Sequence, residues 1–152
     1  MTTRRNFLIL AAAMPVALAA GRGAHAATPS VFASDGVAIK GYDPVAYFTD
    51  GKPVKGDPAF TSAWDGAELR FASAANKATF DADPEAYAPK YGGYCADAVS
   101  QGYTASTDPD AWTIHENRLY LNYSKRVRRI WLKDVDGHIA AADENWPGVL
   151  SA

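Results

Sequence analysis

The chain has 152 residues and a net charge of -2, with 48% hydrophobic and 21% charged residues. This length and balance are typical of one globular domain. Its 12 glycines and 9 prolines are scattered along the chain and form no repeat, which excludes collagen-like, solenoid and low-complexity proteins. A pI of about 5.9 argues against a nucleic-acid-binding protein.

Residues 1–26 have the features of a secretory signal peptide. Arg4 and Arg5 precede a short apolar run, and small residues lead up to a cleavage site between Ala26 and Ala27. An arginine pair just before Asn-Phe-Leu is typical of twin-arginine signals, with a general-pathway signal as the alternative. The apolar run is too short and too rich in alanine for a stable membrane anchor. We therefore expect a periplasmic or secreted bacterial protein that passes through the twin-arginine export machinery.

Cleavage would leave residues 27–152 as the mature domain, with 12 basic and 17 acidic side chains. Cys95 is the only cysteine, so no intramolecular disulfide can form. The mature chain also has only two histidines, His115 and His138, and no methionine. Any site for a soft metal must therefore be built from this small set of side chains together with carboxylates.

The first half of the mature chain predicts a strand, a short helix and a hairpin. Val37 and Ile39 alternate with small or polar residues, as in a strand, and Asp43-Pro44 is typical of a helix start, here running through about Phe48. Residues 59–72 predict a hairpin, because Asp-Gly is a strong two-residue turn signal. A turn at Asp65-Gly66 pairs three sets of residues on one apolar face: Trp64 with Ala67, Ser62 with Leu69, and Phe60 with Phe71.

Two short helical segments follow this hairpin. Ser73 is placed to cap a helix over 74–82, with Ala78 and Phe80 turned inward. Asp83-Pro84 begins another helical turn, which Pro89 ends.

The last third of the chain predicts a second hairpin and two helices. In residues 112–123, a turn at Glu116-Asn117 places Ile114 opposite Leu119 and Trp112 opposite Leu121. Ser124 begins a helix with an apolar face and a solvated basic face, which we expect Gly137 to end. The apolar face would hold Val127, Ile130, Trp131 and Val135. A final helix is predicted over 139–146. Together these elements predict a small α+β domain of two antiparallel hairpins with several short helices.

The first hairpin and the helix after it resemble the YHS-domain family. The resemblance rests on Asp43-Pro44-Val45, Phe71-Ala72-Ser73, Phe80 and Asp83-Pro84-Glu85-Ala86-Tyr87, and covers about residues 41–87. Residues 88–152 look like the extension of an exported subfamily of YHS domain-containing (seleno)proteins. That likeness is carried by Tyr91-Gly92-Gly93-Tyr94-Cys95-Ala96, Leu119-Tyr120-Leu121-Asn122-Tyr123 and Ala142-Asp143-Glu144-Asn145-Trp146-Pro147.

The resemblance implies association with a metal, but this chain lacks the family's thiols. Metal-type members have cysteine at the positions held here by Ala46, Ala72 and Asn76. Thiolate ligation is impossible at that place, so the chain either keeps the scaffold without the metal or uses Cys95 instead. In some members of the subfamily the position matching Cys95 is selenocysteine, which implies a redox or soft-metal role.

Two interpretations of Cys95 remain open from the sequence. Residues 94–99 are compatible with a short helix, and a cysteine near a helix N-terminus is favoured as a thiolate nucleophile or ligand. Alternatively, Cys95 is a small buried hydrophobic residue between aromatic neighbours. Tyr42, Tyr47, Tyr91, Tyr94 and Tyr103 could line a pocket, although core packing explains most of them.

The sequence leads to three hypotheses about function and identifies no catalytic residue. The first is a metal-associated or sensory binding module, with copper or another soft metal held by Cys95. His115 and His138 are weaker candidate ligands, because each is expected in a turn and neither has a second ligand nearby in the sequence. The second is a thiol redox protein that an external thiol resets. The third is a scaffold that has lost its metal and binds a protein partner. We expect a soluble monomeric binding protein rather than an enzyme.

Overall fold

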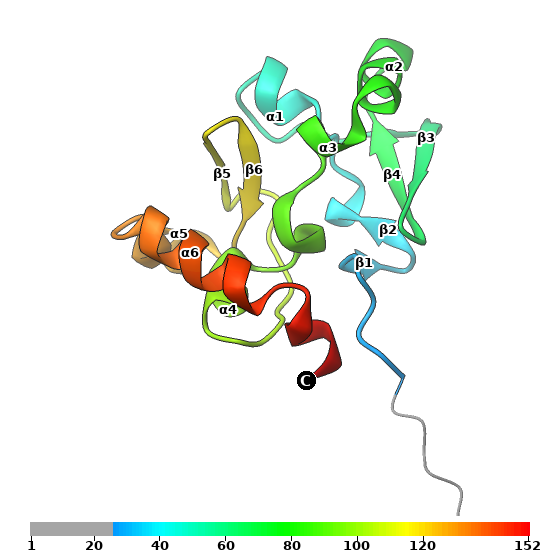
Figure 1. The fold of residues 1–152 in the computed structure, drawn as a ribbon. Helices are drawn as coiled ribbons and strands as arrows, with labels where there is room; N and C mark the ends of the chain where they lie inside the picture. Colours follow the sequence, from blue (N-terminus) through cyan, green and yellow to red (C-terminus); the bar gives the residue numbers. More distant parts are fainter. Residues whose placement is uncertain (1–25) are drawn as a thin grey trace, which may run out of the picture.

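The hairpin around Asp65-Gly66 forms one side of the larger sheet in the computed structural model, which describes residues 26–152. Strand β3 (Asp57–Trp64) pairs antiparallel with β4 (Ala67–Phe71), and β2 (Val37–Ala38) pairs parallel with β4. A short β1 (Ala33–Ser34) completes the order β1-β2-β4-β3 (Figure 1). Ile39 was predicted to belong to the same strand as Val37, but β2 ends at Ala38 and Ile39 lies in the 3-10 turn η1 (Ile39–Gly41).

The predicted register of this hairpin is correct near the turn and wrong at its open end. Trp64 pairs with Ala67 and Ser62 with Leu69, as expected. The register then shifts, so that Asp57 rather than Phe60 lies opposite Phe71. Pro58 lies within the shifted stretch, and proline has no N–H group to contribute to a regular ladder. Phe60 still packs, partly buried, against the core.

The three helices next to this sheet begin at the predicted capping residues. Helix α1 (Ala46–Thr49) follows Asp43, α2 (Ala74–Ala82) is capped by the Ser73 side chain, and α3 (Pro84–Tyr87) is capped by Asp83. Phe80 is buried as expected, but Ala78 is exposed. The expectation for Ala78 was wrong because residues two apart on a helix point in nearly opposite directions.

The second hairpin has the predicted register throughout. Strand β5 (Trp112–His115) pairs antiparallel with β6 (Arg118–Leu121), with Trp112 opposite Leu121 and Ile114 opposite Leu119. Along the chain, the turn η2 (Lys90–Gly93) and the five-residue helix α4 (Ala96–Ser100) lie between α3 and β5. The chain therefore forms the predicted α+β domain of two hairpins with short helices (Figure 1).

The C-terminal helices differ from the prediction. Helix α5 (Lys125–Trp131) is capped by Ser124 but ends before residue 135, and α6 (Val135–Asn145) begins there. Gly137 lies in the first turn of α6, where its N–H donates to the capping carboxylate of Asp134 at 3.1 Å, so it does not end a helix. Ile130 is 47% exposed rather than on the inner face, whereas Trp131 is fully buried. The chain ends in the 3-10 turn η3 (Gly148–Ser151).

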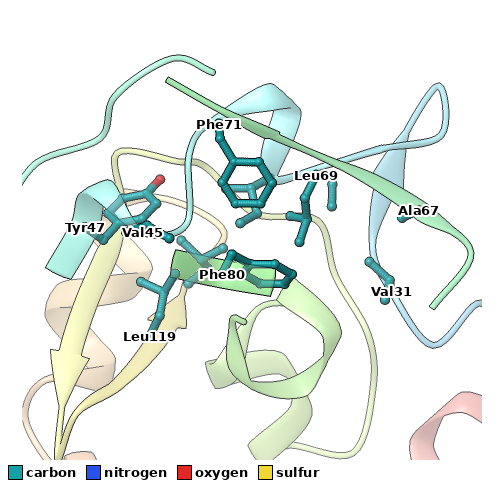
Figure 2. Close-up of a cluster of buried hydrophobic side chains, with 11 residues drawn as sticks. Val31, Val45, Tyr47, Ala67, Leu69, Phe71, Phe80 and Leu119 are labelled. Carbon is teal, nitrogen blue, oxygen red and sulfur yellow. The ribbon is translucent and has the colours of Figure 1, made fainter. Parts of the chain in front are cut away.

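The hydrophobic core has two clusters, and strand β6 contributes to both. Leu119 and Leu121 belong to the first cluster, and Tyr120 between them belongs to the second. Figure 2 shows side chains of the first cluster converging from the two sheets, α1 and α2, among them Val45, Tyr47, Leu69, Phe71, Phe80 and Leu119. The second cluster includes Tyr91, Tyr94, Val99, Trp131 and Ala142. The C-terminal third is thus packed into the same domain as the YHS-like part.

The predicted signal peptide lies almost wholly outside the described residues. Of its cleavage site, Ala26 and Ala27 are described, and both are exposed. Within residues 26–152, no helix is both long enough and apolar enough to cross a membrane.

We expect Gly92→Ala to destabilise the domain strongly. Gly92 has φ +61°, and its carbonyl accepts a hydrogen bond from the N–H of Phe32 at 2.9 Å. A Cβ there would overlap the backbone carbonyl of Ser30. Positive φ and overpacking together should cost about 2 kcal/mol or more of unfolding free energy. Chemical denaturation of the variant would measure this cost.

Gly148→Ala is the matched control, because a Cβ at Gly148 would meet no atom within 4 Å and its φ is not positive. Its unfolding free energy should stay close to that of the natural chain. Equal stability of the two variants would contradict the close packing assigned to Gly92.

Candidate functional site

The three positions that hold cysteine in metal-type relatives meet around one carboxylate, that of Asp43. Asp43 is completely buried. Its Oδ1 accepts hydrogen bonds from the backbone N–H groups of Val45 at 2.8 Å and Ala46 at 3.3 Å. Its Oδ2 accepts from the N–H of Ala72 at 2.8 Å and from Nδ2 of Asn76 at 2.7 Å. The place of the family's thiols is therefore occupied by a hydrogen-bonded carboxylate.

This place does not fit a soft metal ion. Ala46 and Ala72 have no side-chain donor atom, and the amide of Asn76 donates to Asp43. Soft metals prefer thiolate or thioether ligands, and the one carboxylate here already accepts four hydrogen bonds. The side chains at these three positions therefore do not form a binding site for a soft metal.

Cys95 lies immediately before helix α4, as the sequence predicted, and is 1% exposed. Its Sγ accepts a hydrogen bond from the backbone N–H of Tyr123 at 3.2 Å, and Nδ2 of Asn122 lies 3.9 Å away. Its own N–H donates to the carbonyl of Ala105 at 3.0 Å. Cys95 is thus fixed by the loop before β5 and by the residues that follow β6.

A cavity of about 250 Å³ reaches Cys95 from the surface. Two of its lining side chains, Tyr103 and Tyr123, are 51% and 57% exposed and lie at the solvent side. Its other lining residues are Asp97, Ala98, Ala105 and Val127. We call this space the Cys95 cavity. It combines aromatic walls, a sulfur atom and a carboxylate.

Two buried oxygen atoms beside Cys95 have no hydrogen-bond partner among the described residues. They are Oδ1 of Asp97, which lines the cavity, and Oδ1 of Asn122, whose amide contacts the sulfur. The other carboxylate oxygen of Asp97 accepts from Nε2 of Gln101 at 2.7 Å. A buried polar atom without a partner lowers the free energy of unfolding by about 1–3 kcal/mol. Both oxygens are inaccessible to solvent and Asn122 is not among the lining residues, so they form a buried polar region behind Cys95 rather than acceptors open to the cavity.

The two histidines lie apart from the lining of this cavity. His138 is in helix α6 rather than in the expected turn, and its Nδ1 lies 3.1 Å from Oγ of Ser100 and 3.8 Å from Oδ1 of Asp97. His115 ends strand β5 beside its turn, with Nε2 3.0 Å from Oδ1 of Asp136. Across residues 26–152, no three His, Cys, Asp or Glu side chains form a group that could hold a metal ion. The structure does not unite Cys95, His115 and His138 in one site.

A larger groove of about 450 Å³ lies where the first hairpin meets the C-terminal segment. Trp64, Tyr91 and Trp146 form part of its wall. Its two cations are already engaged: Arg118 donates to the carbonyl of Glu85, and Lys90 lies 5.3 Å above the Tyr91 ring and 3.7 Å from Asp143. The hydroxyl of Tyr91 donates to the same Asp143 at 2.8 Å, and burial followed by this bond raises the pKa of Tyr91. The cations of the groove are therefore not free to bind a ligand.

Sequence reasoning found part of this site. Cys95 and Tyr103 were identified as candidates, and both line the cavity. Tyr42, Tyr47, Tyr91 and Tyr94 lie elsewhere: Tyr47, Tyr91 and Tyr94 belong to the core clusters, and Tyr42 packs against the first of them. Tyr123 and Val127 were missed as site residues. The available signal was that Tyr123 ends the segment resembling the subfamily, but its contact with Cys95 spans 28 residues and depends on tertiary structure.

Comparison with known proteins identifies one domain. The family model of the YHS domain matches residues 45–91, so a YHS domain occupies this part of the chain. The matched residues include the Ala46, Ala72 and Asn76 positions but not Cys95. No curated protein matches the chain, and no solved structure matches it either.

We expect Asp43→Asn to destabilise the protein by roughly 2–4 kcal/mol. The amide NH₂ would replace one carboxylate oxygen and face two N–H donors, leaving them unsatisfied in a buried place, at about 1–3 kcal/mol for each. Chemical denaturation measures the change in unfolding free energy. Asp35→Asn is the control, because Asp35 is exposed and its φ of 52° is one that asparagine readily adopts. A change of the same size in both variants would show that the Asp43 network has no special role.

Proposed function

We propose that this protein is an exported, non-enzymatic binding protein that uses a YHS domain as a scaffold without a resident metal. Its guest binds in the Cys95 cavity. The observation that carries the proposal is the contrast between two places in the fold. The positions that would hold the family's thiols are closed around Asp43, whereas the one thiol of the chain, 1% exposed, belongs to the lining of the Cys95 cavity. Export is supported by the signal features of residues 1–26.

The cavity suits one aromatic group that carries a hydrogen-bond donor. A cavity of about 150 Å³ is large enough for a benzene ring, so the 250 Å³ of the Cys95 cavity can admit a phenol or indole ring. Tyr103 and Tyr123 provide aromatic walls for such a ring, and aromatic pairs add about 0.5–1.5 kcal/mol beyond the area they bury. Asp97 is the acidic residue of the lining, and its buried Oδ1 would accept from a donor on the guest once binding opens the wall.

Thiol–disulfide exchange at Cys95 is a second candidate function, favoured by the position of Cys95 in the wall of the cavity. In this reaction the Cys95 thiolate attacks one sulfur of a guest disulfide, forms a mixed disulfide and releases the other sulfur as a thiolate. An external thiolate then attacks the mixed disulfide and restores Cys95. The Cys95→Ser variant separates the two functions, because exchange requires the sulfur and aromatic binding does not.

The protein should carry no stoichiometric metal that depends on Cys95. Within residues 26–152 no three suitable ligands come together, and the Sγ of Cys95 already accepts a backbone hydrogen bond. Mass spectrometry of metals would be performed on protein purified without chelator, for the natural chain and for Cys95→Ser. The metal content should be substoichiometric and equal in the two proteins. One equivalent of copper or zinc that disappears in Cys95→Ser would establish the metal-binding alternative and contradict the proposal.

Indole should bind in the Cys95 cavity. Titration followed by ¹H–¹⁵N NMR should shift the amide signals of Tyr103, Tyr123 and Val127. Val127→Trp should abolish these shifts, because Val127 lines the cavity and the larger side chain fills it. Ala75→Trp adds the same indole to the exposed face of α2 and should leave binding intact. Absence of shifts in the natural chain, or equal shifts in Val127→Trp, would contradict guest binding at this place.

A further inference from the structure

The exposed hydrophobic side chains of the protein gather around helix α5. Across residues 26–152, the large hydrophobic side chains that are exposed are Tyr103, Tyr123, Ile130 and Leu132, at 51%, 57%, 47% and 41%. Tyr103 and Tyr123 flank the Cys95 cavity together with Val127 of α5, and Ile130 lies one helical turn beyond Val127. Clustering of exposed apolar groups on one surface is typical of an interaction site, whereas scattered ones need no explanation.

The same surface carries the largest concentration of positive charge. Five of the 12 basic residues after Ala26 fall within 125–133, a stretch that contains no acidic residue. The remaining seven basic residues share the rest of the mature chain with 17 acidic ones. Arg126, Arg129 and Ile130 have helical spacing i, i+3 and i+4, so they share one face of α5, and all three are exposed. The molecule is therefore acidic overall with one basic, apolar face.

These basic side chains are free to meet a partner. The ion pairs within 4.0 Å found across residues 26–152 involve other residues, namely Arg70, Lys77, Lys90, His115 and His138. Arg128 is engaged, since its Nε donates to Oγ1 of Thr113 at 2.8 Å. Lys125, Arg126, Arg129 and Lys133 are exposed and have no carboxylate partner in this part of the chain. We call Tyr103, Tyr123, Lys125, Arg126, Arg129, Ile130 and Lys133 the α5 surface.

We propose that the α5 surface docks an acidic segment of another protein and that an aromatic side chain of this segment enters the Cys95 cavity. The second half of the proposal rests on the proposed function, whereas the first half rests on charge and exposure alone. Tyrosine and arginine are enriched in protein interfaces and in their energetically dominant positions. The positive face complements a negative partner, and this complementarity speeds encounter and selects the partner.

A protein partner fits this surface better than a lipid membrane. Helix α5 has only seven residues, and its exposed apolar groups flank a concave cavity rather than forming a continuous apolar helix face. A cavity suited to one ring is also typical of an anchor residue at a protein interface.

The test uses a synthetic peptide of eight glutamates around one central tyrosine and the isotope-labelled protein as purified from cells. In ¹H–¹⁵N NMR at low salt, the peptide should shift the signals of the α5 surface and of the cavity, and added salt should weaken binding. The double variant Arg126→Glu/Arg129→Glu should weaken binding by about tenfold or more. Lys40→Glu/Lys52→Glu makes the same change in net charge at two exposed lysines elsewhere and should have little effect.

The outcomes separate the two parts of the proposal. If both double variants lose binding equally, net charge alone explains the loss. That result would overturn docking at the α5 surface. Binding to vesicles of anionic phosphatidylglycerol that depends on Arg126 and Arg129, without binding to the peptide, would overturn it in favour of a membrane. A peptide with alanine in place of tyrosine should bind more weakly. If it binds equally well and the arginine dependence remains, the acidic docking surface is supported and the cavity is excluded as the guest site.

Discussion

One buried carboxylate, that of Asp43, links three segments of the YHS domain. It accepts hydrogen bonds at the start of α1, at the end of β4 and from the Asn76 side chain of α2. A fully buried charge is tolerable only when donors surround it, and charge-assisted bonds are stronger than neutral ones. In metal-type relatives, thiolates at these positions would join the same segments through a metal. In this chain the hydrogen bonds of Asp43 hold the same segments together without thiols.

The β5–β6 hairpin extends this constraint to the C-terminal part of the chain. Leu119 and Leu121 pack with the core that includes Val45 and Phe71, while Tyr120 packs with Trp131 in the second cluster. The residues that follow β6 then fix Cys95, through the N–H of Tyr123. The position of the cavity therefore depends on the core of the YHS domain, even though Cys95 lies outside the residues that match the family model. The extension forms part of the domain rather than an appendage.

The sequence predicted the elements whose causes are local. The helix starts at Ser73, Asp83 and Ser124 follow from side-chain caps, and the two hairpins follow from their turn residues. Gly137 was misinterpreted because a glycine that ends one helix and a glycine in the first turn of the next look alike in sequence. The deciding interaction is the cap from Asp134, whose carboxylate accepts a hydrogen bond from the N–H of Gly137.

The candidate site was less predictable, because its parts come from distant segments. Cys95 could be found as the only cysteine, and its place before α4 followed from local pattern. The partners that define its surroundings, Asn122 and Tyr123, are 27 and 28 residues away in the sequence. The exposure of Ile130 also escaped prediction, since helical spacing alone gives it an inner position beside Trp131. In the structure α5 ends at Trp131, Val135 belongs to α6, and Ile130 is exposed.

The unsatisfied oxygens of Asp97 and Asn122 argue that the region around Cys95 is more than a packing feature. A core filled only for stability would replace such groups by apolar side chains, because each buried acceptor without a donor costs about 1–3 kcal/mol. The Asp43 network shows that this same chain satisfies a buried carboxylate fully where structure alone is at stake. The proposed guest would supply the donor that Oδ1 of Asp97 lacks only if binding exposes this buried atom, which lies 3.8 Å from Nδ1 of His138. In the proposal, the adjoining basic face attracts an acidic segment whose aromatic side chain is the guest of the cavity.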